Sequence, residues 1–460
     1  MLPPFAKWIP RERDVASTST RPRILLLTQD FPPRTSVGAA RWEGFAPFLA
    51  DAGWGLDVVM EDPEDVANPD WNRFNRLPAD LRAVSCKRQR PEWYQTLRKL
   101  RGAKPITVEG VAAESTTAVS DEGGLKAILR RTLDITVRWN QSRTLARQFA
   151  DIGSSMCDGR QKVVVSSAPS HYVHVAAAEI ARRNNIPHVM DCRDPWSRFL
   201  PTSTLEKLLP DDELRSQESA TVHRAALIVT NTQAAASAMQ ARFPELRDRV
   251  RCVPNGSDVE PVMAPEAWPT VFQIAHAGSL YLDRDPRPFM RAVARVREKL
   301  KLDASMMRVV FMGPAARIGG RSLSELATEA GIGDMFEDRA PGTREEARQL
   351  MRESMMAVAF QGETKTQVPA KIFEYVAFPL WLLALVGTDS ATADMLSGSD
   401  ALVYNIDDEA ATARAIEESY TKFRAGVMPR PAGFDGRYSR SKQAARMILE
   451  LKQLTGVAAL

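Results

Sequence analysis

The sequence predicts an α/β protein built from two doubly wound parallel sheets. The chain has 460 residues, which is enough for two domains that each bury a core. In both halves, short apolar runs suited to buried strands alternate with segments of helical spacing. That alternation is typical of a parallel sheet with helices on both faces.

The same patterns set the expected boundaries. Residues 1–20 are polar, contain proline and lack periodicity, so we expect a disordered tail. Residues 21–262 form the first predicted domain, and residues 263–436 form the second. We expect residues 437–460 to form a helix.

Short apolar runs bounded by turn residues mark the strands of the first domain. They lie at 24–28, 56–60, 81–86, 163–167, 227–230 and 250–253, with one more between Pro187 and Asp191. The second domain has comparable runs at 272–277, 308–312, 335–337, 356–360, 381–386 and 401–404. Near the C-terminus, Ala444, Met447, Ile448 and Leu451 recur at helical spacing.

An insert interrupts the strand pattern over about 87–135. Its middle, VEGVAAESTTAVSDEGG, has low complexity, and we expect it to be disordered. Basic residues interleaved with Trp93 and Tyr94 precede this stretch. Such a segment can lie on an anionic membrane surface, or it can form a helical flap with a solvated charged face.

Composition excludes several classes of protein. The net charge is only +4, which disfavours a nucleic-acid binder held by bulk charge. Four cysteines (Cys86, Cys157, Cys192 and Cys252) show no paired spacing, so neither a disulfide framework nor a zinc site is expected. The N-terminus lacks a signal-peptide core, and the longest apolar run is broken by Pro379. We therefore expect a cytoplasmic protein, in solution or peripheral at the inner face of the cell membrane.

The segment 367–387 joins a helix start to a buried strand. Pro369 suits the first turn of a helix, and we expect Phe378-Pro379 to end it. Lys371 and Glu374 are three residues apart, so their side chains leave neighbouring turns of one face. A cation and a carboxylate at this position can bind a phosphorylated, sugar-bearing ligand. The alternative is a solvated ion pair between the two side chains on an ordinary helix.

Polar residues also lie at strand ends in the first domain. Gly38 is in a loop just ahead of a helix, where the backbone would pass close to a ligand. Asp191, Arg193 and Asp194 stand at the end of a strand, on the side where α/β folds bind ligands. They could bind ligand hydroxyls, or they could form an internal ion-pair network that braces the loop.

Several motifs, taken together, resemble the retaining glycosyltransferases of family 4. They include FPP before the helical Arg41, Asp-x-Arg-Asp-Pro-Trp at 191–196, VPNGSD at 253–258 and PAKIFEY at 369–375. The resemblance covers roughly residues 23–454, apart from the insert. It implies the GT-B fold, in which two Rossmann-like domains face a central cleft. It also implies that the helix at 437–460 crosses back to the first domain.

The resemblance implies that the second domain binds a nucleotide diphosphate. Gly278 matches the glycine of the family's Gly-Arg-Leu motif, with Ser279 at the arginine position and Arg284 at the position of a later lysine. Lys371 can supply the second positive charge. Gly313 follows the next strand, at a turn that faces the donor in the family.

Further residues are assigned by the same resemblance. Glu374 matches the glutamate that holds the ribose, and Pro369 belongs to its motif. Thr366 stands where many members have another glutamate. Gly38 lies in a loop that approaches the donor phosphates, and Arg41 follows it on the helix.

The resemblance also places residues around the acceptor. His174 falls at the histidine position of one subgroup, where a neutral imidazole can donate to a sugar hydroxyl or phosphate. A lone helical histidine can equally be structural. Asp191, Arg193 and Asp194 would contact the acceptor, together with Arg41.

We therefore expect a retaining glycosyltransferase that moves a sugar from a nucleotide-diphosphate sugar to a saccharide or lipid-linked hydroxyl acceptor, in polysaccharide or glycoconjugate biosynthesis. His174, Arg284 and Lys371 are the expected catalytic side chains. No metal or other cofactor is expected, because no acidic pair with metal-ligand spacing stands in the donor region. The alternatives are a nucleotide-sugar epimerase and a degenerate, non-catalytic binding subunit. Thr366 argues against the epimerase, and with Ser279 it keeps the binding subunit open.

Overall fold

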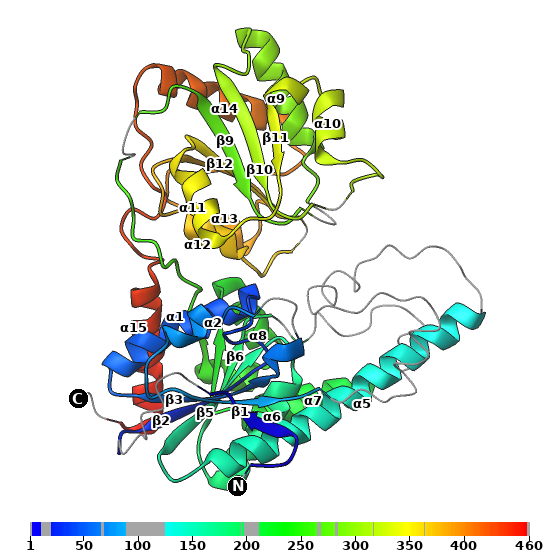
Figure 1. Ribbon diagram of the computed structural model, residues 1–460, viewed down its shortest axis with the longest axis vertical. Helices are drawn as coiled ribbons and strands as arrows, with labels where there is room; N and C mark the ends of the chain where they lie inside the picture. Colours follow the sequence, from blue (N-terminus) through cyan, green and yellow to red (C-terminus); the bar gives the residue numbers. More distant parts are fainter. Residues whose placement is uncertain are drawn as a thin grey trace. The chain divides into compact units, whose positions relative to one another are not determined.

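The computed structural model describes residues 2–10, 20–65, 69–88, 125–194, 196, 211–264, 268–280, 284–315, 317–362 and 364–457. The chain divides into two compact units, each with its own sheet (Figure 1). Unit 1 comprises Met1–Asn231, Ala236–Val253 and Ala444–Leu460, and unit 2 comprises Thr232–Ala235 and Pro254–Gln443.

Within the described residues, eight strands form the sheet of unit 1. They are β1 (Ala6–Trp8), β2 (Arg23–Thr28), β3 (Gly55–Glu61), β4 (Arg82–Cys86), β5 (Gln161–Ala168), β6 (His188–Cys192), β7 (Leu227–Thr230) and β8 (Val250–Cys252). Their order is β1-β4-β3-β2-β5-β6-β7-β8. The chain therefore winds outward in one direction from β2 and in the other from β5, as a doubly wound sheet does.

All neighbouring strands of this sheet are parallel except β1, which pairs antiparallel with β4 at the edge. The next residue, Ile9, is buried and donates its N–H to the carbonyl of Ala83. The expectation that residues 1–20 are disordered is therefore wrong for β1 and Ile9. A strand of three residues with a partly exposed face leaves no periodic signal.

Helices cover both faces of the sheet of unit 1. They are α1 (Ala40–Asp51), α2 (Trp71–Asn75), α5 (Leu125–Met156), α6 (Tyr172–Asn184), α7 (Asp211–Arg224), α8 (Gln233–Arg242) and α15 (Arg440–Thr455), with short 3₁₀ turns at η1 (Val37–Ala39), η2 (Pro63–Asp65) and η5 (Pro244–Arg249). Ile24 and Leu26 of β2 pack on the side of α1 and α15, whereas Leu25 and Leu27 pack on the side of α5 and α6. Because both faces are covered, β2 is apolar over most of its length.

The C-terminal helix α15 contributes to the core of unit 1. Ala444, Met447 and Leu451 are fully buried in the same cluster as Ile24 of β2, and Ile448 packs against that cluster. The chain thus returns to unit 1 after completing unit 2. Of the predicted insert, residues 89–124 lie outside the described residues, and α5 begins at Leu125.

Unit 2 is built on a second sheet, which is parallel throughout its described strands. The strands are β9 (Phe272–Ala277), β10 (Met307–Met312), β11 (Phe336–Arg339), β12 (Met356–Phe360), β13 (Trp381–Leu385) and β14 (Leu402–Tyr404). Their order is β11-β10-β9-β12-β13-β14, so this sheet winds outward from β9 and β12. Both predicted parallel sheets are confirmed.

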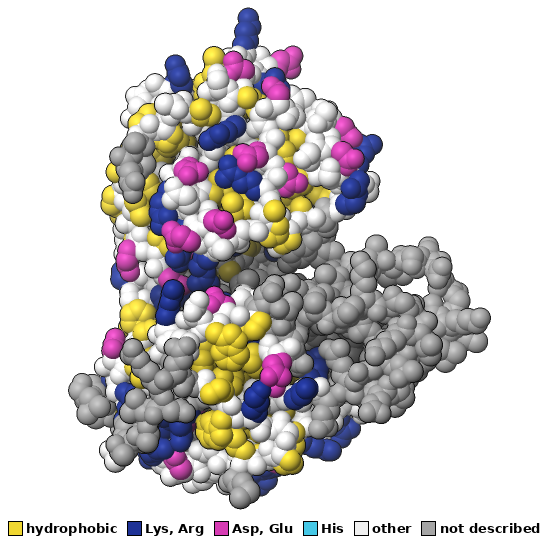
Figure 2. All heavy atoms as spheres, in the orientation of Figure 1, with side chains coloured by type: hydrophobic (Ala, Val, Ile, Leu, Met, Phe, Trp, Pro, Cys, Tyr) yellow, Lys and Arg dark blue, Asp and Glu magenta, His cyan; other side chains and the backbone are white. Residues whose placement is uncertain are grey.

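The helices of unit 2 divide between the two faces (Figure 1). The first face carries α9 (Arg287–Leu300), α10 (Leu323–Glu329) and α14 (Glu409–Arg424), and the second carries α11 (Arg344–Arg352), α12 (Ala370–Tyr375) and α13 (Ala391–Leu396), with η6 (Gly333–Met335) before β11. Figure 2 shows Lys and Arg side chains interspersed with Asp and Glu on the visible face of unit 2. One ion pair of unit 2 joins Arg291 of α9 to Glu409 of α14, 2.7 Å apart.

Candidate functional site

The sheet of unit 2 opens at the carboxyl ends of β9 and β12. These two strands pair through Ile274 with Met356 and Ala275 with Ala357, and the pairing stops there. On its other side, β9 pairs with β10 along its whole length. Because the direction of winding reverses between β9 and β12, this opening is where α/β sheets bind ligands.

Two buried side chains, one from each face, bond to backbone groups where β9 and β12 diverge. The Tyr375 hydroxyl of α12 accepts the N–H of Ala277 at 2.7 Å and donates to the Ala277 carbonyl at 2.9 Å. The Nδ1 atom of His276 lies 2.9 Å from the Val358 carbonyl. Backbone groups that a continued ladder would have paired are therefore satisfied by side chains.

The pKa of His276 depends on the charged groups at this end of the sheet. Burial lowers the pKa of His276 to about 4, the hydrogen bond to Val358 opposes that shift, and the positive charges of Arg284 and Lys371 lower the pKa further. Arg284 comes from the loop after β9 and Lys371 from the first turn of α12. The two predicted cations therefore act on the same buried ring.

Gly278 and Gly313 allow two loops to meet beside these cations. A Cβ at Gly313, whose φ is +141°, would lie 2.3 Å from the Gly278 carbonyl oxygen, so a side chain is excluded. Gly278 donates its N–H to the Met312 carbonyl at 2.9 Å. A Cβ at Gly278 would lie 3.7 Å from Cγ of Lys371. Ser279 contributes its carbonyl, which accepts from Nη1 of Arg284 at 3.2 Å.

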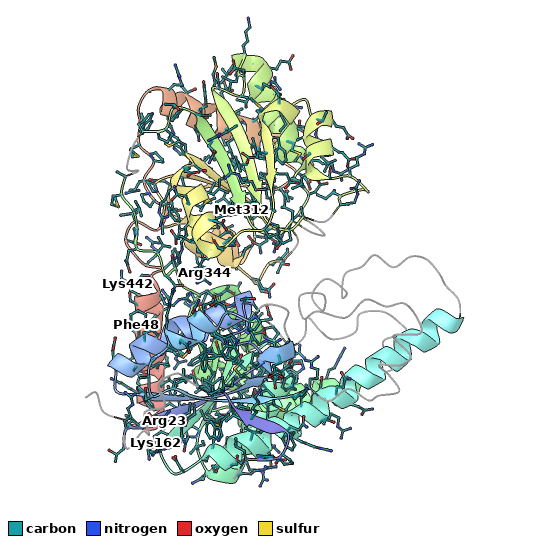
Figure 3. All side chains as sticks on the ribbon, viewed as in Figure 1. Arg23, Phe48, Lys162, Met312, Arg344 and Lys442 are labelled. Atoms are coloured by element: carbon teal, nitrogen blue, oxygen red, sulfur yellow. The ribbon has the colours of Figure 1, made fainter. Side chains whose placement is uncertain are left out.

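Lys371 and Glu374 do not pair with each other. No residue in the described part of the chain bonds to the Lys371 ammonium, and the Glu374 carboxylate lies 3.7 Å from Nε of Arg344. Nη1 of Arg344 in turn lies 3.3 Å from Asp258. The alternative of a simple Lys371–Glu374 ion pair is therefore wrong. Arg344 is the first residue of α11, and Figure 3 labels it together with Met312 at the end of β10.

The helix that carries these residues is shorter than the sequence suggested. It spans six residues, Ala370–Tyr375, with Pro369 as its N-cap. The loop ahead of it is fixed by Gln361, whose side-chain amide donates to the carbonyls of Thr364 and Gln367, each at 2.7 Å. The Thr366 carbonyl accepts from the Thr232 hydroxyl at 2.6 Å.

In unit 1 the corresponding reversal of winding lies between β2 and β5. Buried Arg193 ties the two loops there, because its Nε donates to the Ala168 carbonyl at 2.7 Å and its Nη1 donates to the Gly38 carbonyl. A Cβ at Gly38 would lie 2.8 Å from Oδ2 of Asp30 and 3.2 Å from Nη1 of Arg193. Burial lowers the pKa of Arg193, against the opposing charges of Asp191, Asp194 and Asp30. Gly38 is therefore packed against charged groups, and Asp194 is half-buried nearby.

Arg41 and Asp191 form an internal ion pair. Nε and Nη2 of Arg41 each donate to Asp191 at 3.1 Å, and Nη2 also donates to the Val253 carbonyl. Asp191 also accepts from the indole of Trp42 and the hydroxyl of Ser167, both at 2.8 Å. Both side chains are almost completely inaccessible. The acceptor contact expected for Arg41 and Asp191 has no support in this geometry, which matches the alternative of an ion-pair network.

His174 is buried and lies in a cluster of histidines. Ser166 Oγ lies 2.7 Å from both Nδ1 of His174 and Nε2 of His188. The ring of His171 stacks on Trp196, with centroids 4.8 Å apart. Burial lowers the pKa of His174 well below its usual value and that of His188 to about 3, so both rings are neutral. A direct contact of His174 with a ligand has no support here, because the side chain is inaccessible.

The structure thus brings Gly278, Ser279, Arg284, Gly313 and Lys371 together, with Glu374 on the same short helix as Lys371. In unit 1 it links Gly38 to Arg193 and Arg41 to Asp191. Sequence reasoning missed four residues, His276, Arg344, Gln361 and Tyr375. The nearest signals were a histidine inside an apolar strand and a tyrosine next to the predicted glutamate.

Among the residues that the structure describes, no group of three His, Cys, Asp or Glu side chains could hold a metal ion. None of the described helices combines the length and the apolar character needed to cross a membrane.

Comparison with known proteins identifies the fold. No protein-family model matches the chain, and no curated protein matches it in sequence. Among solved structures, sucrose-phosphate synthase from Thermosynechococcus elongatus is similar over 95% of this chain and 100% of its own, with a TM-score of 0.58 and 14% identity. The α,α-trehalose 6-phosphate synthase from Burkholderia multivorans matches over 95% of this chain and 97% of its own, with a TM-score of 0.58 and 14% identity.

A third structure, HepE from Anabaena in complex with UDP-glucose, matches over 94% of this chain and 99% of its own, with a TM-score of 0.56 and 12% identity. These neighbours have the GT-B fold. The chain shares that fold, with two Rossmann-like parallel-sheet domains.

Proposed function

We propose that this protein is a retaining glycosyltransferase that moves a sugar from a nucleotide-diphosphate sugar to a hydroxyl acceptor. One observation carries the proposal: Lys371 lies beside the Gly278 turn and Arg284 bonds to the neighbouring Ser279 carbonyl, where the sheet of unit 2 opens between β9 and β12. The Lys371 ammonium has no partner within the described residues, so its charge is available to an anion. Two of the neighbours are sugar-phosphate synthases, and HepE forms a complex with UDP-glucose, which supports a diphosphate as that anion.

In the proposed reaction, the bond between the anomeric carbon and the diphosphate breaks, and the diphosphate leaves with the bonding electrons. Arg284 and Lys371 stabilise the negative charge that develops on it. The acceptor hydroxyl attacks from the same face and gives its proton to the leaving phosphate, which retains the configuration. No side chain acts as a nucleophile, and no metal is assigned.

Glu374 is proposed to accept hydrogen bonds from the ribose hydroxyls. Its side chain is 19% exposed, and its one ion-pair contact within the described residues is the long one to Arg344, which leaves its oxygens available. Arg344 would orient the carboxylate. Losing a hydrogen bond to a charged group typically costs about 1.5–3 kcal/mol, which corresponds to roughly 10- to 150-fold in affinity.

Unit 1 is proposed to bind the acceptor, a saccharide or a lipid-linked sugar used in polysaccharide or glycoconjugate synthesis. Arg193 and Asp194 follow β6, and Gly38 lies in the 3₁₀ turn η1 after β2, at the carboxyl edge of the sheet. Arg41, Asp191 and His174 would support these loops from within the core. Contact of the insert with a membrane remains a proposal, since its centre lies outside the described residues.

Isothermal titration with UDP-glucose, GDP-mannose and ADP-glucose tests the donor site. We expect one of the three to bind clearly better than the others. Glu374→Ala should weaken that binding at least tenfold, and Lys371→Met should weaken it more than Lys365→Met does. Lys365 is a matched control, because it lies in the preceding loop and pairs with the exposed Asp389.

Incubating the preferred nucleotide-sugar without acceptor separates the alternatives. A transferase leaves the sugar configuration unchanged and transfers it once an acceptor from a sugar and glycolipid panel is added. An epimerase produces a new sugar signal by NMR. If none of the three nucleotide-sugars binds, the donor-site assignment is wrong, and the binding-subunit alternative gains support.

A further inference from the structure

One nitrogen of His276 bonds to the backbone, and the other makes no hydrogen bond within the part of the chain that the structure describes. A carbonyl oxygen can only accept, so the proton of the neutral ring must sit on Nδ1, which faces Val358. Nε2 therefore carries a lone pair. That atom is buried and makes no hydrogen bond to any described residue. An unsatisfied polar atom in a buried position needs an explanation.

The backbone groups around Nε2 favour the protonated ring over the neutral one. The carbonyls of Val358 and Gly278 both favour the protonated ring, because each can accept one of its two N–H groups. A Cβ at Gly278 would lie 3.2 Å from Nε2, so this nitrogen points at the Gly278 turn. In the neutral ring, the lone pair of Nε2 instead faces a carbonyl oxygen.

What opposes protonation is burial and two positive charges. The rings of Phe311 from β10 and Phe360 from β12 pack beside the imidazole, with centroids 5.4 and 5.2 Å away. The charged groups that act on His276 are Arg284, from the loop after β9, and Lys371, from α12. Both are cations, and both belong to the proposed diphosphate site.

We propose that His276 takes up a proton when a nucleotide-diphosphate sugar binds, so that an imidazolium joins Arg284 and Lys371 beside the diphosphate. The proton comes from solvent and binds the Nε2 lone pair, and no bond of the ligand changes. The two negative charges of the diphosphate offset the two cations that keep the free ring neutral. This inference rests on the proposed function, because it requires a diphosphate at this end of the sheet.

The linkage has a definite sign. The pKa of His276 is about 4 in the free protein, and in the complex it is higher. Binding therefore becomes tighter as the pH falls through the pKa of the complex, and it levels off below the pKa of the free protein. Over the pH range in which the ring is protonated in the complex and neutral in the free protein, affinity rises by up to about tenfold for each pH unit that the pH falls.

Calorimetry in buffers of different ionisation enthalpy measures the proton directly. UDP-glucose, GDP-mannose and ADP-glucose are suitable probes, because their bridging diphosphate has no group that titrates near pH 6.5. With the tightest binder of the three, we expect an uptake of roughly half to one proton per complex at pH 6.5. His276→Asn keeps an amide N–H for Val358 and lacks Nε2, so its uptake should vanish and its affinity should be equal at pH 6 and pH 8.

His223→Asn is the matched control, because His223 is an exposed histidine of unit 1 that pairs with Glu245. It should leave the proton uptake unchanged. The proposal is overturned if the wild-type protein binds a nucleotide-sugar without proton uptake, or if His276→Asn takes up as many protons as the wild type. If no nucleotide-sugar binds at all, the proposed function fails together with this inference.

A second measurement does not depend on the variant folding. The chain has only five histidines, so ¹⁵N-histidine NMR of the wild-type protein resolves individual rings. We expect one ring to change from the Nδ1–H tautomer to the imidazolium when the nucleotide-sugar is added at pH 6.5. A ring that stays neutral at saturation contradicts the proposal.

Discussion

Replacing Tyr375 with Phe tests whether this hydroxyl holds the donor site together. The Tyr375 hydroxyl makes both of its hydrogen bonds to Ala277, whose N–H and carbonyl lie beyond the last pairing of β9 with β12. The residue is buried, so water cannot replace the lost group without rearrangement. Burial also raises the pKa of Tyr375, which keeps the hydroxyl protonated at neutral pH.

The expected magnitude follows from these two bonds. Each buried hydrogen bond contributes about 1 kcal/mol, and leaving a buried partner unsatisfied adds to the cost. Tyr375→Phe should therefore lower the free energy of unfolding of unit 2 by about 2–3 kcal/mol. For a domain of 150–250 residues, that loss lowers Tm by roughly 4–12 °C.

Affinity for the preferred nucleotide-sugar should fall as well, by roughly tenfold, because Tyr375 fixes the short helix that carries Lys371 and Glu374. Differential scanning calorimetry and isothermal titration give the two readouts. Tyr420→Phe is the control, because Tyr420 is a buried tyrosine of unit 2 whose hydroxyl bonds to nothing in the described part of the chain. Equal stability and equal affinity in the two variants would refute the reasoning.

Three other predictions concern single residues. Gly313→Ala should destabilise unit 2 by about 1–3 kcal/mol or more in urea unfolding, since its φ is +141° and a Cβ would meet the Gly278 carbonyl. Asp191→Ala should cost about 3–5 kcal/mol, because it leaves Arg41 buried and unpaired; a cost below 1 kcal/mol would contradict the buried pair. The pKa of His188 is about 3 in the folded protein and about 6.5 in the unfolded chain, so the unfolded chain binds a proton first as the pH falls. The free energy of unfolding should therefore decrease as the pH falls from 6.5 towards 3, and this one residue should lower it by about 2 kcal/mol between pH 8 and pH 5. His188→Gln should flatten that pH dependence of the unfolding free energy by one proton.

Much of the fold could be predicted because the strands of a parallel sheet are buried on both faces. The apolar runs at 24–28 and 356–360 match β2 and β12 closely. The edge strand β1 was not predicted, because two of its three residues are exposed and give no apolar run. The helix after Pro369 was expected to run to Phe378, but it ends at Tyr375, where turns lead into β13.

The site was harder to predict, because its residues are set by contacts between distant segments. Arg41 and Asp191 are 150 positions apart, so no local pattern shows that they pair. His276 is the fifth residue of an otherwise mostly apolar strand, and its position near the carboxyl end of that strand was the available signal. His276 became a candidate site residue because the pairing of β9 with β12 ends just before it, and this pairing can be seen only in the folded sheet.

The Arg41 side chain of unit 1 is bonded within the protein, whereas Lys371 of unit 2 is not bonded to any described residue. Substitutions at these two positions should therefore have different effects on stability and on binding. In unit 1 the Arg41 guanidinium bonds to Asp191 and Val253 and is almost completely buried, so removing it changes the folding free energy first. In unit 2 the Lys371 ammonium bonds to no described residue, so Lys371→Met removes little from the folded protein. A substitution at Lys371 should therefore weaken nucleotide-sugar binding with Tm nearly unchanged, whereas a substitution at Arg41 should lower Tm before it changes donor affinity.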